Sequence, residues 1–354
     1  MPIGAEGAGG AIVPPEGEGG IVLDVRAIRI STEVPRMIRT LVLSATLMAS
    51  LSAGAQTFPQ RSLTLLVPNP PGGLVDTSAR IVSESLPKVL NQPVVVDNRP
   101  GGSGNIAYQA VARAKPDGYT LLASYSAYHV ANPSMMANLP WQPKDFVPVA
   151  LITVATNVVA VHPGVPATNL AEFLAYLKAN PGKLNYASQG NGSLSHIGTE
   201  MFKQLTNTDM RHVAYKGSGA AIQDVLCGQV QVFITTPPSV MGHVLAGKLK
   251  ALAIAGKNRH PMMPTIPTTS EAGLKGFELE AWVALFAPAG TPAAVITQLS
   301  EATKRALDQP DARQRASGAG IEIRHLGPDA LAALVRDEIE FWGKVIKAGN
   351  ITAD

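Results

Sequence analysis

Short apolar runs alternate with amphipathic stretches along most of the chain after residue 56. The run 63–67 ends in Pro-Asn-Pro-Pro-Gly-Gly, and from Leu74 onward apolar residues recur with a period near 3.6. Solidly apolar strands separated by helices are typical of a parallel sheet that helices cover on both faces. The pattern therefore predicts an α/β fold.

The alternation occurs in two sets, which favours two α/β lobes. The predicted strands are 63–67, 93–96, 119–123, 184–187, 211–215, 230–234 and 249–254. The predicted helices begin at 74 and then cover 106–114, 170–179, 196–205, 220–226, 293–307 and 328–348. We expect the chain to cross between the lobes near 155–159 and to return near 280–285. A ligand should bind where the carboxyl ends of strands meet helix N-termini.

The first 55 residues predict an export signal. Residues 1–36 are rich in Gly, Pro and Glu, and we interpret them as an over-extended gene start that precedes the true initiator, Met37. Residues 37–55 combine Arg39, with Arg36 just before them, an apolar run at 41–51 and the small-x-small sequence Ala53-Gly54-Ala55, as in a secretory signal peptide. The alternative is an amphipathic anchor helix. We expect a soluble, exported protein whose mature form starts near Gln56.

Composition excludes some classes of protein and disfavours others. A chain that is 46% hydrophobic can bury a core, so it is not wholly disordered. The formal net charge of +3 has no basic block, which argues against nucleic-acid binding. The single Cys227 excludes an intrachain disulfide framework, and the seven histidines show no close pairing typical of metal ligands. We expect no metal and no cofactor.

Three glycine-rich loops stand between predicted strands and helices: 70–73, 188–193 and 215–219. Glycine lets a backbone approach a ligand closely, and the free N–H groups of a helix start attract anions. Two such loops on opposite lobes would suit a molecule with a carboxylate at each end. The alternative is that these are ordinary turns in which Gly and Ser cap the helices.

Catalytic motifs are absent from the sequence. There is no G-x-S-x-G nucleophile elbow, and Lys216 precedes its glycines instead of following them as in a phosphate-binding loop. An enzyme would have to assemble its site from distant residues. A secreted α/β enzyme of that kind remains an alternative.

A series of short motifs resembles the Bug-type extracytoplasmic solute receptors, the binding proteins of tripartite tricarboxylate transporters. It includes Val-Pro-Asn-Pro-Pro-Gly-Gly at 67–73, Asn-Arg-Pro-Gly at 98–101, Pro-Asp-Gly-Tyr-Thr at 116–120, Tyr-Lys-Gly at 215–217 and Ala-Pro-Ala-Gly-Thr-Pro at 287–292. The series covers nearly all of 58–350 in order. The resemblance implies a two-lobed, periplasmic-binding-protein-like (type II) fold with a hinge and an interlobe cleft. The expected lobes are 56–156 with 282–354, and 157–281.

The resemblance also implies where the ligand binds. The candidate ligand-binding residues are Gly72, Gly73, Tyr125, Ser126, Tyr128, Ser188, Gly190, Asn191, Gly192, Ser193 and Thr235. Thr235 departs from the family, because many relatives have an aspartate there that could pair with a ligand ammonium. Tyr125 and Tyr128 stand where relatives often have small hydroxyl residues. They would offer aromatic surface, unless one or both pack beneath the loop.

The expected function is that of a periplasmic receptor, a monomer, that captures a small organic carboxylate. The resemblance implies delivery to the membrane subunits of a tripartite tricarboxylate transporter, without catalysis. The departures at Thr235, Tyr125 and Tyr128 favour a dicarboxylate or an aromatic carboxylate over an amino acid. A receptor that presents its ligand to a sensor kinase is the remaining alternative.

Overall fold

The computed structural model describes residues 58–352. The predicted signal peptide, its cleavage site and the proposed start at Met37 lie outside these residues. Within 58–352, no helix combines the length and apolarity that a membrane-spanning segment requires.

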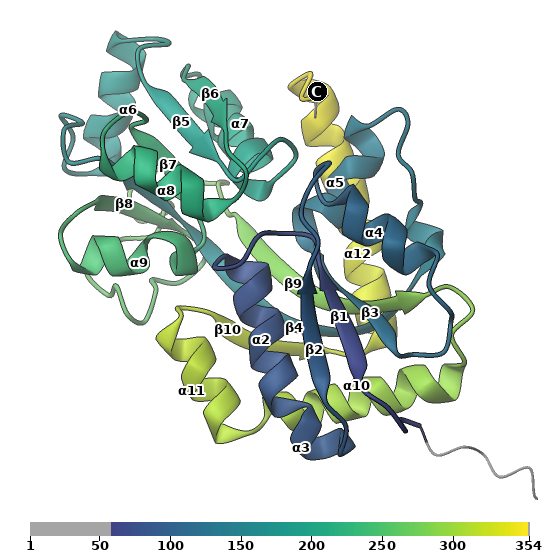
Figure 1. Ribbon diagram of the computed structural model, residues 1–354. Coiled ribbons are helices and arrows are strands. Elements are labelled where there is room, and N and C mark those ends of the chain that lie inside the picture. Colours follow the sequence, from purple (N-terminus) through teal and green to yellow (C-terminus); the bar gives the residue numbers. More distant parts are fainter. Residues whose placement is uncertain (1–57, 353–354) are drawn as a thin grey trace, which may run out of the picture. The chain divides into compact units, whose positions relative to one another are not determined.

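The described chain forms two lobes that share one long strand, β4 (Figure 1). In lobe 1 the strand order is β2-β1-β3-β9-β4, with β10 also paired to β4. In lobe 2 it is β4-β7-β5-β6, with β8 also paired to β4. The strands are β1 (Leu63–Val67), β2 (Val94–Asn98), β3 (Thr120–Tyr125), β4 (Phe146–Val161), β5 (Asn185–Ser188), β6 (Arg211–Ala214), β7 (Val232–Thr235), β8 (Lys250–Ala255), β9 (Glu280–Pro288) and β10 (Glu322–Leu326).

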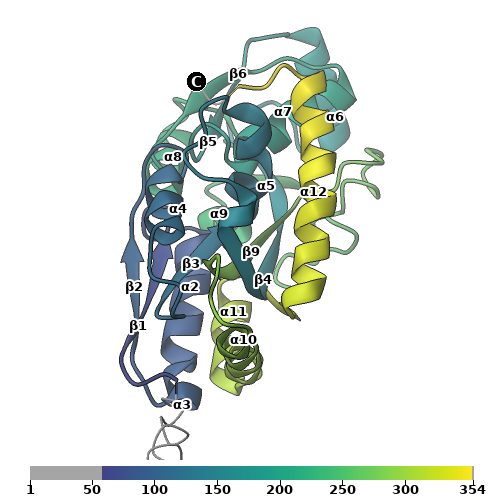
Figure 2. The same cartoon turned by 90° about the vertical axis from the view of Figure 1, so that its right-hand side faces the viewer.

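Helices follow most strands and cover the sheet. Lobe 1 contains α2 (Leu74–Ser85), α3 (Pro87–Leu90), α4 (Asn105–Ala112), α5 (Ser126–Met135), α10 (Ala293–Leu307), α11 (Pro310–Gly318) and α12 (Pro328–Ala348). Lobe 2 contains α6 (Leu170–Ala179), α7 (Leu194–Thr206), α8 (Ser218–Leu226) and α9 (Pro237–Leu245). The last long helix, α12, lies against α5 and β4 (Figure 2). This confirms the predicted two-lobed α/β fold.

The sheet is mixed, so the prediction of a parallel sheet is wrong at its centre. The outer strands are parallel: β1 with β2 and β3, and β5 with β6 and β7. The central strand β9 runs antiparallel to β3 and β4, and β4 is antiparallel to β7, β8 and β10. The physical reason is the two-lobed chain path. One segment must cross from lobe 1 to lobe 2 and another must return beside it in the opposite direction.

The outgoing chain and the returning chain cross between the lobes at neighbouring positions of the sheet. The pairing of β4 with β9 ends at Thr156 opposite Glu280, and the pairing of β4 with β8 starts at Asn157. The backbone N–H and the side-chain Nδ2 of Asn157 both donate to the carbonyl oxygen of Leu279, each at 2.9 Å. Asn157 is buried. The outgoing and returning chains are therefore bonded to each other where they pass between the lobes.

Alternate side chains of the crossing strand β4 pack on opposite faces of the lobe 2 sheet. Val159 belongs to the core that contains Phe173 of α6 and Phe202 of α7. Its neighbour Val158 belongs to a separate cluster with Ile222 of α8. This is the period-2 alternation of a strand that is buried on both sides.

The packing of α7 against the returning chain predicts opposite effects for two helical glycines. A Cβ added at Gly198 would lie 2.8 Å from Cδ1 of the buried Leu279, whereas a Cβ at Gly242 in α9 would meet nothing within 4 Å. Gly198→Ala should destabilise the protein by about 1–3 kcal/mol through overpacking. Gly242→Ala should stabilise it by about 0.5–1 kcal/mol, because alanine loses less backbone entropy in a helix. Urea unfolding measures both, and an unchanged midpoint for Gly198→Ala would contradict this packing.

Candidate ligand-binding cleft

A small cavity lies between the lobes, at the loops that follow the carboxyl ends of the parallel strands. Its volume is about 10 Å³, close to the minimum that holds one water molecule. The wall is made by Asn69, Pro70, Gly73, Leu74, Val75 and Tyr125 from lobe 1, and by Gln189, Gly217 and Ser218 from lobe 2. The cleft is therefore nearly closed in this structure.

The two lobes touch directly across the cleft. A Cβ at Gly217 would lie 2.9 Å from Cγ of Pro70, and a Cβ at Gly73 would lie 3.2 Å from Oγ of Ser218. Gly217 also has a φ of 98°, which L side chains rarely adopt. Glycine is needed at Gly217 for its backbone conformation and for this close approach.

Asp76 holds the first of the cleft loops, between β1 and α2. Its carboxylate accepts hydrogen bonds from the Gly72 N–H, from Nε of Arg80 and from Nδ2 of Asn98, each at 3.0 Å. Burial alone would raise the pKa of Asp76, but the bonds from Arg80, Gly72 and Asn98 outweigh it and lower the pKa. The loop is thus tied to a charged, buried carboxylate.

Tyr125 bridges the cleft from lobe 1. Its hydroxyl accepts the N–H of Leu194, the first residue of α7, at 3.2 Å and lies 3.5 Å from Oε1 of Gln189. Tyr128 does not line the cavity; a Cβ at Gly104 would meet its ring, and it packs edge-on against Tyr125 with centroids 5.2 Å apart. Burial raises the pKa of both phenols, that of Tyr128 to about 12, so both stay protonated.

Gln189 links two elements on the lobe 2 side of the cleft, the start of α8 and the end of β7. Its Nε2 donates to Oγ of Ser218 at 2.7 Å and to Oγ1 of Thr235 at 3.3 Å. Neither Gln189 nor Asn69 was among the candidate ligand-binding residues. The candidates in this loop were its glycines and serines together with Asn191, and nothing in the sequence favoured Gln189 over its neighbour Asn191.

The hydroxyls of the remaining candidates bond to other protein groups, within their own loop or on neighbouring strands. Ser193 Oγ donates to the Gly190 carbonyl at 2.6 Å, and Ser188 Oγ lies 2.7 Å from Nε2 of His212. Ser126 Oγ accepts the N–H of Trp282 at 3.2 Å and is buried. Gly72 has open space around it, and Gly192 faces α5 across the cleft, where a Cβ would lie 2.9 Å from Cε of Met135. Asn191 belongs to the same turn as Gly192.

The electrostatics of the cleft come from backbone groups. No described residue in the cavity wall carries a charged side chain. The N-caps of α2, α5 and α8, which are Gly73, Tyr125 and Gly217, form part of that wall, and α7 directs the Leu194 N–H at Tyr125. None of these four helix starts has a side-chain cap. Uncapped helix N-termini present free N–H donors and a partial positive charge, which suit an anion.

A second cavity, of about 680 Å³, lies at the hinge and is lined by residues 154–156, 255–262, 278, 280, 317, 320–322 and 324. Arg324 is paired there with Glu280 at 2.7 Å and with Glu322 at 2.9 Å, and Arg259 is paired with Glu271 at 2.8 Å. Lys257 also lines this cavity, but Glu278, Glu280 and Glu322 line it as well, so its basic side chains are balanced by carboxylates that would repel an anion. Within 58–352, no group of His, Cys, Asp and Glu is arranged to hold a metal ion.

Two α/β lobes joined by crossing strands, with helix N-termini facing a cleft between them, define a solute-binding protein of the periplasmic type. Comparison with known proteins agrees. Residues 78–351 match the model of the tripartite tricarboxylate transporter family receptor. Protein BugT of Bordetella pertussis is 35% identical over 295 residues, which are 83% of this chain and 90% of that protein. The chain therefore belongs to the tripartite tricarboxylate transporter receptor family, which confirms the Bug-type resemblance.

Two solved structures extend the likeness to the fold. Rpa4515 of R. palustris with adipate is 33% identical, with a TM-score of 0.80 over 83% of this chain and 99% of that chain. MatC from Rhodopseudomonas palustris with bound malate is 36% identical, with a TM-score of 0.77 over 82% of this chain and 100% of that chain. Both similarities span both lobes.

Because Asp76 holds the loop between β1 and α2, its substitution should lower the free energy of unfolding strongly. Substitution of its partner Arg80 is the matched control and should lower it little. Asp76→Ala removes three hydrogen bonds to a buried carboxylate and should destabilise the protein by about 2–4 kcal/mol. Arg80→Ala removes only a partner that is 51% exposed, and should cost about 0–1 kcal/mol.

Urea unfolding at several pH values measures both substitutions. Because the folded pKa of Asp76 is lowered, its contribution is complete above the unfolded pKa of about 3.9 and is lost as pH falls through the lower folded value. Equal costs for the two substitutions at pH 7 would show that Asp76 does not organise the loop.

Proposed function

We propose that this protein is a periplasmic receptor that captures a small organic carboxylate and delivers it to the membrane subunits of a tripartite tricarboxylate transporter. Family membership supports the receptor role and the transporter partner. The adipate and malate in the two similar structures support a small carboxylate as ligand. Export through the predicted signal peptide would bring the protein to the periplasm.

The observation that carries the proposal is the set of four uncapped helix starts around a cavity without charged side chains. A helix N-terminus stabilises a nearby anion by about 0.3–1 kcal/mol, and by up to ~2 kcal/mol when partly buried. The Leu194 N–H now donates to the neutral hydroxyl of Tyr125. A carboxylate oxygen is a stronger acceptor than a phenol, so a ligand would take this donor from Tyr125.

Ligand entry requires the lobes to separate. A cavity of about 10 Å³ is too small for any carboxylate. The lobes, 56–156 with 282–354 and 157–281, would move about the two crossings at Thr156–Asn157 and Leu279–Glu280. Hinge closure around a ligand is a common mode of domain motion. The structure corresponds to the closed end of that motion.

The cleft favours a dicarboxylate or an aromatic carboxylate. Thr235 places a hydroxyl near Gln189 and offers no negative charge for an amino acid's ammonium group. Tyr125 contributes a flat ring to the cavity wall, while Tyr128 supports that ring from behind. Only Tyr125 is therefore placed to contact an aromatic ligand.

Calorimetric titration with malate, adipate, terephthalate and glutamate tests the proposal. We expect micromolar, stoichiometric binding of at least one of the first three, no turnover, and no comparable binding of glutamate. Gln189→Leu removes the donor to Ser218 and Thr235 and should weaken binding about tenfold or more. The exposed Gln223→Leu on α8 is the matched control and should bind like the wild type. Thr235→Asp should weaken a dianion through like-charge repulsion.

Two results would contradict the proposal. One is binding of glutamate alone, with none of the three carboxylates. The other is tight carboxylate binding that is unchanged in both Gln189→Leu and Thr235→Asp, which would place the ligand outside this cleft.

A further inference from the structure

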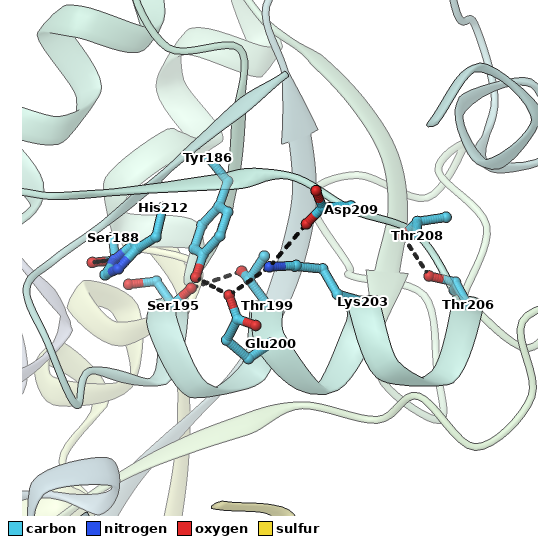
Figure 3. A network of polar contacts seen from close by, with 10 residues as sticks. All are labelled: Tyr186, Ser188, Ser195, Thr199, Glu200, Lys203, Thr206, Thr208, Asp209 and His212. Carbon is cyan, nitrogen blue, oxygen red and sulfur yellow. Dashed lines mark hydrogen bonds and ion pairs between the residues drawn. The ribbon is translucent and has the colours of Figure 1, made fainter. Parts of the chain in front are cut away.

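Three aromatic rings are stacked behind the lobe 2 loop of the cleft. Tyr186 of β5 and His212 of β6 are directly opposite each other in the parallel pair, with ring centroids 4.9 Å apart (Figure 3). His196 of α7 covers the other histidine at 4.1 Å, with an angle of only 6° between the ring planes. His196 is 7% exposed. The two imidazoles therefore lie face to face at the base of the loop 188–194.

Each imidazole holds one part of the Gly190–Gly192 turn. The Gly192 N–H donates to Nδ1 of His196 at 3.2 Å. The Gly190 N–H donates to Oγ of Ser188 at 3.2 Å, and that oxygen lies 2.7 Å from Nε2 of His212. The Ser188 hydroxyl still has its own proton to donate, and we assign that proton to Nε2 of His212. Both imidazoles then act as acceptors, which requires both to be neutral.

These bonds determine which donors reach the cleft. The Gly192 amide is directed at His196 and the Gly190 amide at Ser188 Oγ, so neither is offered to a ligand. The Gln189 N–H is also used internally, by Ser195 Oγ at 2.9 Å. The Gln189 side chain and the Leu194 N–H lie beside Tyr125, where they face the cleft. The stacked rings thus fix the groups that do face a ligand.

The surroundings keep the rings neutral. Burial lowers the pKa of His196 to about 4, helped by the charge of Lys203. Burial, His196 and Lys203 lower the pKa of His212 to about 4, against an opposing effect of Glu200.

The charged groups near the stack also bond to one another. Glu200 and Lys203 come from α7 and form an ion pair at 3.0 Å, and Asp209, ahead of β6, lies 3.5 Å from Lys203. The Tyr186 hydroxyl donates to Glu200 at 2.5 Å (Figure 3). Glu200, the carboxylate that favours a charged His212, is therefore already bonded to Lys203 and Tyr186.

We propose that His196 and His212 are positioning residues of the cleft. As neutral acceptors they hold the Gly190–Gly192 turn, and through it they orient Gln189 and the start of α7 toward the ligand. The effect on affinity rests on the proposed function, whereas the effect on the turn does not.

Amide hydrogen exchange at Gly192, followed by NMR with ¹⁵N-glycine, tests the proposal without a ligand. His196→Leu removes the acceptor and should speed exchange at Gly192 by roughly 100-fold. His196→Asn keeps an oxygen near the Nδ1 position and should restore protection to within about tenfold of the wild type. Tyr186→Phe, which keeps the ring but loses the bond to Glu200, is the matched control and should not change it.

The pH titration of the wild-type ring signals provides a test that needs no variant. Both rings should remain neutral from pH 8 to about pH 5.5. Because their folded pKa values are lowered, their contribution to stability is complete above the unfolded pKa of about 6.5 and declines as pH falls toward about 4. Titration of either ring near pH 6.5 would overturn the proposal.

Affinity for malate and adipate completes the test. His196→Leu should bind about tenfold more weakly than the wild type, and His196→Asn should recover most of that loss. If the wild type binds none of malate, adipate and terephthalate but Gly192 exchange behaves as expected, the receptor function fails and the positioning role stands. If Gly192 stays protected in His196→Leu, or loses protection equally in His196→Asn, the positioning role is wrong.

Discussion

The strand β4 is the constraint on which the rest of the structure depends. Along its 16 residues it bonds first to β9 and β10 in lobe 1 and then to β7 and β8 in lobe 2. A strand that is paired on both edges cannot slide, so relative motion of the lobes is confined to the change of partners at Thr156–Asn157. There Asn157 bonds twice to the returning chain at Leu279. Each lobe can then be rigid while the angle between the lobes varies.

The position of the cleft follows from this chain path. The parallel strands β1 and β3 in lobe 1, and β5 and β6 in lobe 2, end toward the gap between the lobes and continue there into loops and helices. The result is a ring of helix starts with neutral side chains between them. An anion in such a site is stabilised by backbone N–H groups, and the site has no buried charge of its own to compensate when it is empty. This explains how the cleft can close without a ligand.

Much of this fold could be predicted from the sequence. The strand 63–67 and the helices 170–179, 293–307 and 328–348 lie where the pattern places them, because each is an apolar or amphipathic stretch with Gly or Pro within three residues of its end, and the predicted strand 211–215 is observed at 211–214. The crossing strands were harder to predict. The segment 146–161 is mostly apolar with few turn signals, and its antiparallel partners are distant in the sequence, by 71 or more residues for β7 and β8 and by more than 120 for β9 and β10. Pro133 inside α5 and the two prolines at the start of α9 hide those helices.

The site was predictable as loops, but less so as individual contacts. Gly73 and Gly217 stand out in sequence because close approach and a positive φ require glycine, and the structure places both in the cavity wall. The different positions of Tyr125 and Tyr128 depend on the approach of Gly104 to the Tyr128 ring, a contact that no local pattern encodes. The same holds for His196 and His212, which meet only because α7 packs on the β5–β6 pair.

A crystal structure of the protein with a bound dicarboxylate tests the central claim most directly. The account predicts a carboxylate oxygen within hydrogen-bond distance of the Leu194 N–H, in place of the Tyr125 hydroxyl, with no Arg or Lys side chain within about 4 Å of that carboxylate. A carboxylate paired with an arginine or lysine, or bound in the hinge cavity beside Arg324, would contradict it.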